Sequence, residues 1–109
     1  THELDFFVGG IWHMNMQAML RQAQKIQSEM MKEKKAIDET LFEGNSELVT
    51  IKAYGNRNIE SVSIKDEAME DKEMLQDMLL IAFNDLIEKI DKKTEEKMGK
   101  YTNGMSGLF

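Results

Sequence analysis

The chain has 109 residues, no cysteine, and 14 basic against 20 acidic side chains, which gives a formal net charge of −6 at pH 7. This length fits one small domain, and such a domain buries only about two-thirds of the surface that its unfolded chain exposes, so a partner subunit would add stability. The composition excludes a disulfide framework and a cysteine-based zinc site, suits a reducing cytoplasm, and contains no apolar run near the roughly 20 residues that span a bilayer.

Residues 1–13 have the character of an expression leader. Aromatic residues and a Gly-Gly pair precede His13 and Met14, the pair that a common cloning junction leaves before a start codon. Acidic side chains occur where a signal peptide would carry positive charge. We therefore expect the natural chain to begin at Met14 or Met16, which would remove both histidines from the candidate chemistry. A genuine N-terminal segment is the alternative.

Residues 15–36 have the pattern of a helix that packs against another helix. Apolar side chains recur at spacings of three and four, with Gln and Lys in the intervals, at Met16, Met19, Ala23, Ile26 and Met30. This spacing is the heptad seam of paired helices. Neither proline nor glycine occurs between residues 11 and 43, and Ala, Met, Gln, Lys and Glu favour helix. We predict one helix over this segment.

The middle of the chain changes to the two-residue alternation of strands. Residues 41–44 lead into residues 48–54, and a second alternating run follows at residues 59–64. Gly44-Asn45-Ser46 and Gly55-Asn56-Arg57-Asn58 supply the residues that tight turns require. The pattern predicts a three-stranded antiparallel meander whose single apolar face must be covered by helix.

A second long helix is predicted from about residue 72 to residue 99. Asp66 or Asp71 can cap its start, acidic side chains precede it, and lysines gather near its end, as the helix dipole favours. The central run 78–83 and the apolar residues after it occupy most of the helix circumference, so we expect burial from more than one side. Glycines from Gly99 onward predict a flexible tail.

Basic side chains gather toward the two ends of the chain, and acidic ones in the middle. Residues 16–35 hold five bases against two acids, residues 36–88 four against thirteen, and residues 89–109 five against three. Local clusters decide whether a protein binds a polyanion, so the acidic total does not exclude one. The candidate contacts to such a polyanion are the bases of the two end segments: Arg21, Lys25, Lys32, Lys34, Lys35, Lys89, Lys92, Lys93, Lys97 and Lys100.

Several segments together carry a resemblance to a known family. They are the Met/Gln/Lys-rich residues 19–27, the glycine-turned meander, residues 71–77 running into Ala82-Phe83-Asn84-Asp85, and the tail segments 96–98 and 104–105. The chain after residue 13 resembles the YbaB/EbfC family of bacterial nucleoid-associated proteins. The resemblance implies an α+β homodimer whose sheets and second helices form a body and whose first helices protrude as tweezer-like arms. It also implies binding of double-stranded DNA with broad sequence tolerance in the cytoplasmic nucleoid, without a cofactor, membrane or small-molecule substrate.

Other functions have less support in the sequence. The lysines could form a solvated helix face, helped by pairs such as Asp85 with Lys89, and a dimeric protein-binding adaptor would explain the apolar seam equally well. An enzyme is disfavoured, because the carboxylates alternate with lysines and no serine has a native histidine as its base. The ten methionines suit core packing better than a soft-metal site, and the acidic run 66–77 lacks the pattern of a calcium loop. RNA remains an alternative to DNA as the polyanion.

Overall fold

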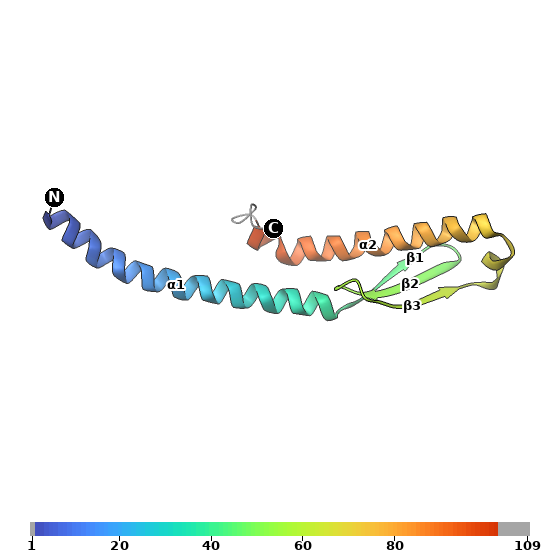
Figure 1. The fold of residues 1–109 in the computed structure, drawn as a ribbon, viewed down its shortest axis with the longest axis horizontal. Coiled ribbons are helices and arrows are strands. Elements are labelled where there is room, and N and C mark those ends of the chain that lie inside the picture. The colour runs from blue at the N-terminus through green and yellow to red at the C-terminus, as the bar shows by residue number, and fades with distance from the viewer. Residues whose placement is uncertain (1, 103–109) are drawn as a thin grey trace. The chain divides into compact units, whose positions relative to one another are not determined.

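The computed structural model describes the backbone of residues 2–102 and the side chains of residues 15–101. Its elements are α1 (His2–Glu39), β1 (Leu41–Asn45), β2 (Val49–Tyr54), β3 (Ile59–Ile64), the short 3-10 helix η1 (Asp66–Glu70) and α2 (Lys72–Thr102) (Figure 1). This order confirms the predicted α+β class, with a three-stranded meander between two long helices. The chain divides into two compact units, one ending at Lys32 and the other beginning at Glu33.

Helix α1 is longer than predicted at both ends. It begins at His2, inside the segment expected to be an expression leader, so that this segment continues the helix; Thr1 lies outside the described residues. The origin of the segment stays a prediction. At the other end, the Thr40 hydroxyl donates to the Ala36 carbonyl oxygen at 2.6 Å and the Thr40 amide to the Ile37 carbonyl at 3.1 Å. These bonds satisfy carbonyl groups of the last helical turn before the chain enters β1.

The strands form an antiparallel sheet in the order β1-β2-β3, as the meander predicts. In β2 the side chains of Val49, Ile51 and Ala53 are buried and alternate with half-buried polar neighbours. Ile51 pairs with Gly44 of β1 on one side and with Val62 of β3 on the other, so all three lie on the same face of the sheet. That face is the one that helix must cover.

Two tight turns connect the strands. In the first, the Ser46 amide donates to the Val49 carbonyl at 2.8 Å, and the Val49 amide donates to the Ser46 hydroxyl oxygen at 3.2 Å. In the second, the Asn58 amide donates to the Asn56 side-chain oxygen at 2.8 Å, an Asx-type turn. Arg57 adopts a φ of 73°, the left-handed region that Gly and Asn enter more readily than Arg.

Helix α2 runs alongside the sheet and supplies the other half of the core (Figure 1). Asp71 caps its start, because its Oδ1 accepts from the Glu73 and Met74 amides at 3.1 and 3.2 Å. A Cβ at Gly44 would overlap the Ala82 carbonyl oxygen and the Leu86 Cβ, so glycine permits the close approach of β1 to α2. The buried cluster is Val49, Ile51, Ala53, Ala82, Leu86 and Ile90.

The end of α2 differs from the prediction. The helix passes through Gly99 and continues to Thr102, with Met98 and Tyr101 buried. One glycine lowers helix propensity by only about 1 kcal/mol, which the packing of neighbouring side chains can offset. The tail predicted beyond this point falls on residues 103–109, which lie outside the described residues.

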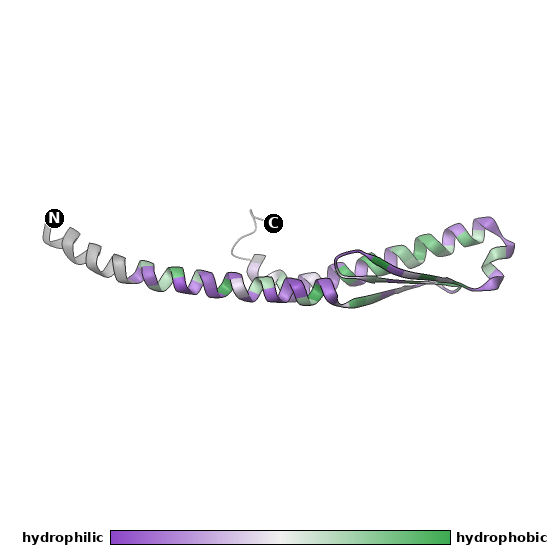
Figure 2. Ribbon diagram, turned by 60° about the horizontal axis from the view of Figure 1, so that its bottom comes forward, coloured by the Kyte–Doolittle hydropathy of each residue, from purple (hydrophilic) through white to green (hydrophobic). Residues whose placement is uncertain are grey.

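A single chain covers only one side of α2. Toward β1, Asp85 Oδ2 accepts from the Asn45 amide at 2.9 Å, and the Lys89 ammonium donates to the Glu43 carbonyl oxygen at 2.9 Å. Toward β3 the surface is open and apolar, and hydropathy colouring shows apolar residues along the middle of α2 (Figure 2). We call this surface the open apolar face; its exposed members are Leu80, Phe83 and Ile87 of α2 and Ile59 and Val62 of β3. The expected burial of α2 from more than one side is therefore not achieved within one chain.

Candidate nucleic-acid interface

The basic side chains of the first unit share one face of α1. Arg21, Lys25 and Lys32 follow one another at spacings of four and seven residues, which return to the same side of a helix. All three are exposed. Met19 and Ile26 lie on the opposite side of the helix, and they are exposed as well, at 61% and 38%. The seam predicted from the sequence is thus separate from the basic face and uncovered in the first unit.

The second unit contributes the other predicted contacts from the end of α1 and from α2. Lys35 is exposed, whereas Lys34 pairs with Asp38 at 3.0 Å. Lys93, Lys97 and Lys100 recur at spacings of four and three on one face of α2, and the Lys100 ammonium lies 5.0 Å from the centre of the Tyr101 ring. Within the described residues, Lys92, Lys93 and Lys97 form no ion pair. These three ammonium groups are exposed and free to meet a polyanion.

Lys89 differs from its neighbours because its ammonium group has a structural role. It binds the Glu43 carbonyl oxygen of β1 and forms the predicted ion pair with Asp85 at 3.0 Å. The Asn45 amide, followed by the Lys89 ammonium, holds the pKa of Asp85 below its ordinary value, because both groups stabilise the charged carboxylate. Lys89 and Asp85 together fasten β1 to α2, which leaves Lys89 less available to a ligand than the lysines beyond it.

The acidic run at the start of α2 lies far along the helix axis from the free lysines. The helix has 31 residues and is therefore roughly 45 Å long. The acidic run that begins at Asp66 in η1 ends at Asp77 in the second turn of α2, and the free lysines begin at Lys92. Fifteen residues of helix place these two positions roughly 22 Å apart along the axis. This exceeds the Debye length of about 8 Å at physiological salt, so the distant acidic run hardly affects the potential around the lysines. Carboxylates nearer to the lysines do reduce that potential; they are Glu88, Asp91, Glu95 and Glu96.

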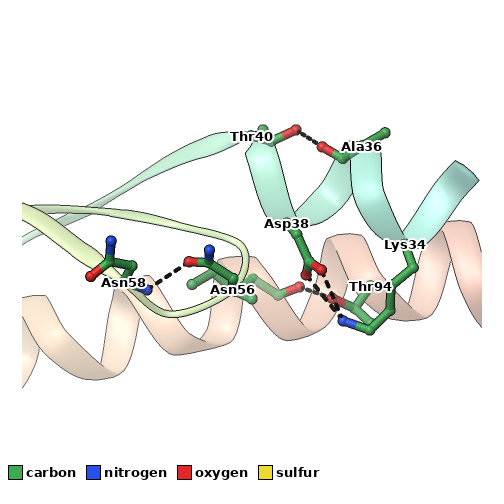
Figure 3. A network of polar contacts seen from close by, with 8 residues as sticks. Lys34, Ala36, Asp38, Thr40, Asn56, Asn58 and Thr94 are labelled. Atoms are coloured by element: carbon green, nitrogen blue, oxygen red, sulfur yellow. Dashed lines mark hydrogen bonds and ion pairs between the residues drawn. The ribbon is translucent and has the colours of Figure 1, made fainter. Parts of the chain in front are cut away.

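A polar cleft of about 340 Å³ lies between the end of α1, the β2–β3 turn and α2. Figure 3 shows Lys34 and Asp38 of α1 beside Thr94 of α2, with the Asn56 turn close by. Arg57 also lines the cleft and contacts Asp91 Oδ1 at 3.4 Å. Sequence reasoning missed Arg57 because it belongs to the acidic middle segment. The available signal was an Arg among residues that favour tight turns.

The chain matches the family model described as the YbaB/EbfC DNA-binding family over residues 13–105. The chain belongs to this family. The YbaB/EbfC resemblance seen in the sequence is therefore confirmed, and the match spans the described part of the chain after residue 13.

Several proteins similar to this chain are named nucleoid-associated proteins. A nucleoid-associated protein of Ligilactobacillus salivarius is 44% identical over 99 residues, covering 87% of this chain and 95% of the relative. A nucleoid-associated protein of Enterococcus faecalis is 44% identical, covering 86% of this chain and 94% of the relative. A nucleoid-associated protein of Chloroflexus aurantiacus is 37% identical, covering 88% of this chain and 100% of the relative. The crystal structure of the uncharacterized protein HP0035 from Helicobacter pylori has a TM-score of 0.59 at 21% identity, covering 69% of this chain and 92% of that one, which supports the fold.

YbaB/EbfC membership does not assign individual DNA contacts, so the ten basic residues named from the sequence stay predictions. Within the described residues, no group of three His, Cys, Asp or Glu side chains is arranged to hold a metal ion. No helix in that part of the chain is both long enough and apolar enough to cross a membrane.

Proposed function

We propose that this protein is a homodimeric nucleoid-associated protein that binds double-stranded DNA in the cytoplasmic nucleoid, mainly through phosphate contacts and with low sequence specificity. The observation that carries the proposal is the group of exposed lysines near the end of α2, Lys92, Lys93 and Lys97, which form no ion pair among the described residues. Family membership and the names of the relatives point to the same ligand.

The chemistry of the basic clusters favours phosphate over base recognition. Lys presents a mobile point charge that suits phosphate oxygens, and Arg21 is the one arginine among the ten predicted contacts. Phosphate contacts position a protein on DNA without reading its sequence. Binding should therefore tolerate many sequences and weaken steeply with salt, because every neutralised phosphate releases counterions.

The open apolar face supports dimerisation. Phe83 and Ile87 of α2 border a groove of about 180 Å³ with Ile59 of β3, and all three side chains are exposed at 37% or more. Clustered exposed apolar side chains next to a covered core are typical of an interface. A second copy that packs its own open apolar face here would bury both surfaces and double the number of basic clusters in one particle. The tweezer-like placement of the first helices stays a prediction.

A protein-binding adaptor is the second candidate function, and the uncovered seam of α1 favours it. Met16, Met19 and Leu20 are exposed at 44%, 61% and 59%, and methionine-rich helix faces adapt to varied partners. The two candidate functions differ in their ligand, which is duplex DNA for one and a protein for the other. An enzymatic role has no comparable support in the arrangement of the described side chains.

A duplex titration at several salt concentrations tests the proposal. Fluorescence anisotropy with labelled duplexes of unrelated sequence should give similar affinities, and log affinity should fall linearly with log salt. Replacing Lys25, Lys32 and Lys35 with Glu should abolish binding, while sedimentation still reports a dimer. An adaptor would show no saturable binding to any duplex, and unchanged affinity of the triple variant would reject α1 as a contact surface.

A further inference from the structure

The Arg57 side chain lines the polar cleft, and its guanidinium group makes few contacts with the described residues. Its guanidinium group has five N–H donors, yet within the described residues its single partner is Asp91, at 3.4 Å and therefore at the long limit of a hydrogen bond. The side chain is 71% exposed. In the single chain the group is thus held near the cleft with most of its donors available to a ligand, and it also lines the groove of the open apolar face.

The backbone at Arg57 gives an independent reason to look for a function there. Its φ of 73° is in the left-handed region, although Gly55, Asn56 and Asn58 in the same turn are residues that enter this region more readily. Gly or Asn would adopt this backbone conformation at lower cost than Arg. The presence of Arg at this position therefore points to a requirement for its side chain. At Arg57 that side chain is the guanidinium group.

The cleft contains two cations, Lys34 and Arg57, and two carboxylates, Asp38 and Asp91, that pair with them. Lys34 brings a second positive charge from α1, and its ammonium is held at 3.0 and 3.3 Å from the two oxygens of Asp38. Asn56 uses its side-chain oxygen in the turn, which leaves its amide nitrogen available as a donor. Ile37 and Ile90 add apolar lining, which lowers the local dielectric and strengthens charge interactions.

We propose that this cleft binds a phosphate group of the duplex backbone, with Arg57 as the principal ligand and Lys34 as the second cation. The proposal rests on the DNA binding proposed above and adds a contact outside the ten basic residues named from the sequence. Asp91 orients the guanidinium in the free protein and yields to the incoming phosphate, because an exposed ion pair is weak whereas an arginine–phosphate contact can be bidentate. The carboxylate therefore positions Arg57 and also competes with the ligand.

Four single variants of the full chain test the cleft by anisotropy titration from 0.05 to 0.3 M salt. Arg57→Asn removes the charge and places a residue that accepts the left-handed conformation, so the fold should persist. Its matched control is Lys65→Asn, which removes one charge after β3, at the other end of the strand from the turn. Asp91→Asn frees Arg57 from its competitor, and Asp77→Asn is the control for loss of one carboxylate on the same helix.

We expect Arg57→Asn to lower affinity about eightfold per lost contact at 0.1 M salt and to reduce the salt slope by about 0.9 per contact. Asp91→Asn should raise affinity several-fold more than Asp77→Asn does. If wild-type protein binds and Arg57→Asn behaves as Lys65→Asn does, the cleft proposal is wrong while DNA binding stands. Equal effects of Asp91→Asn and Asp77→Asn would also overturn it. Absence of binding by the wild type would refute both proposals.

Discussion

Replacing Lys93 and Lys97 of α2 tests how many phosphate contacts these lysines make, because each lost contact changes the salt dependence of DNA affinity. Lys93 and Lys97 lie one helical turn apart, are exposed, and have no ion-pair partner in the part of the chain that the structure describes. The double variant Lys93→Gln with Lys97→Gln removes two charges from each protomer and four from the proposed dimer. Each phosphate contact contributes about 0.9 to the slope of log affinity against log salt, so loss of four contacts reduces the slope by about 3.6.

This reduction can be measured as a ratio of affinities. The ratio of wild-type to variant affinity varies inversely with the salt concentration raised to a power, and that power is the change in slope of about 3.6. The ratio should therefore be about 150-fold larger at 50 mM than at 200 mM salt. Anisotropy with one labelled duplex gives both values. The matched control is Lys65→Gln with Lys72→Gln, which removes the same charge beside the acidic run. The reasoning is refuted if the two double variants change the slope equally, because the effect would then follow net charge and not position.

Three further predictions concern assembly and stability. Phe83→Asp should convert the dimer to monomer in sedimentation, because a carboxylate would be buried in the open apolar face, whereas Glu88→Gln on the same helix should leave the dimer intact. Gly44→Ala should destabilise the fold by about 1 to 3 kcal/mol in urea unfolding, because the added methyl group overlaps the Ala82 carbonyl oxygen. Asp85 has a lowered pKa in the folded protein, so its contribution to stability is present above the ordinary value of 3.8 and is lost as the pH falls through the lowered value. The difference in stability between wild type and Asp85→Asn should therefore be largest near neutral pH and shrink at pH values below 4.

Each of these results has a contradicting outcome. A Phe83→Asp protein that sediments as the wild type does would move the interface away from the open apolar face. A Gly44→Ala protein of unchanged stability would show that β1 and α2 can separate slightly without loss of packing. A stability difference between wild type and Asp85→Asn that stays constant down to pH 2 would mean that the bonds to Asn45 and Lys89 do not favour the ionised carboxylate.

Local patterns account for the elements that the sequence predicts well. The alternation of Val49, Ile51 and Ala53 depends on the two-residue period of a strand, and the turns at Ser46 and Asn56 depend on side chains that bond to nearby backbone. The ends of the helices are less well predicted, since α1 reaches Glu39 and α2 reaches Thr102. At the end of α1 the Thr40 hydroxyl and amide bond to carbonyls of the last turn, and at the end of α2 Met98 and Tyr101 are buried.

The sequence by itself determined the α+β order, the meander, the separation of acidic and basic segments and the family, because each depends on neighbouring residues or on overall similarity. Only the tertiary structure decided the role of each cation. Lys89 is fastened to Glu43, 46 residues away, and Arg57 meets Asp91, 34 residues away. The tertiary structure also decided that the sheet covers one side of α2 and leaves the open apolar face uncovered. Such contacts depend on where a helix lies over a sheet, which brings together residues far apart in the sequence and is not encoded in a local pattern.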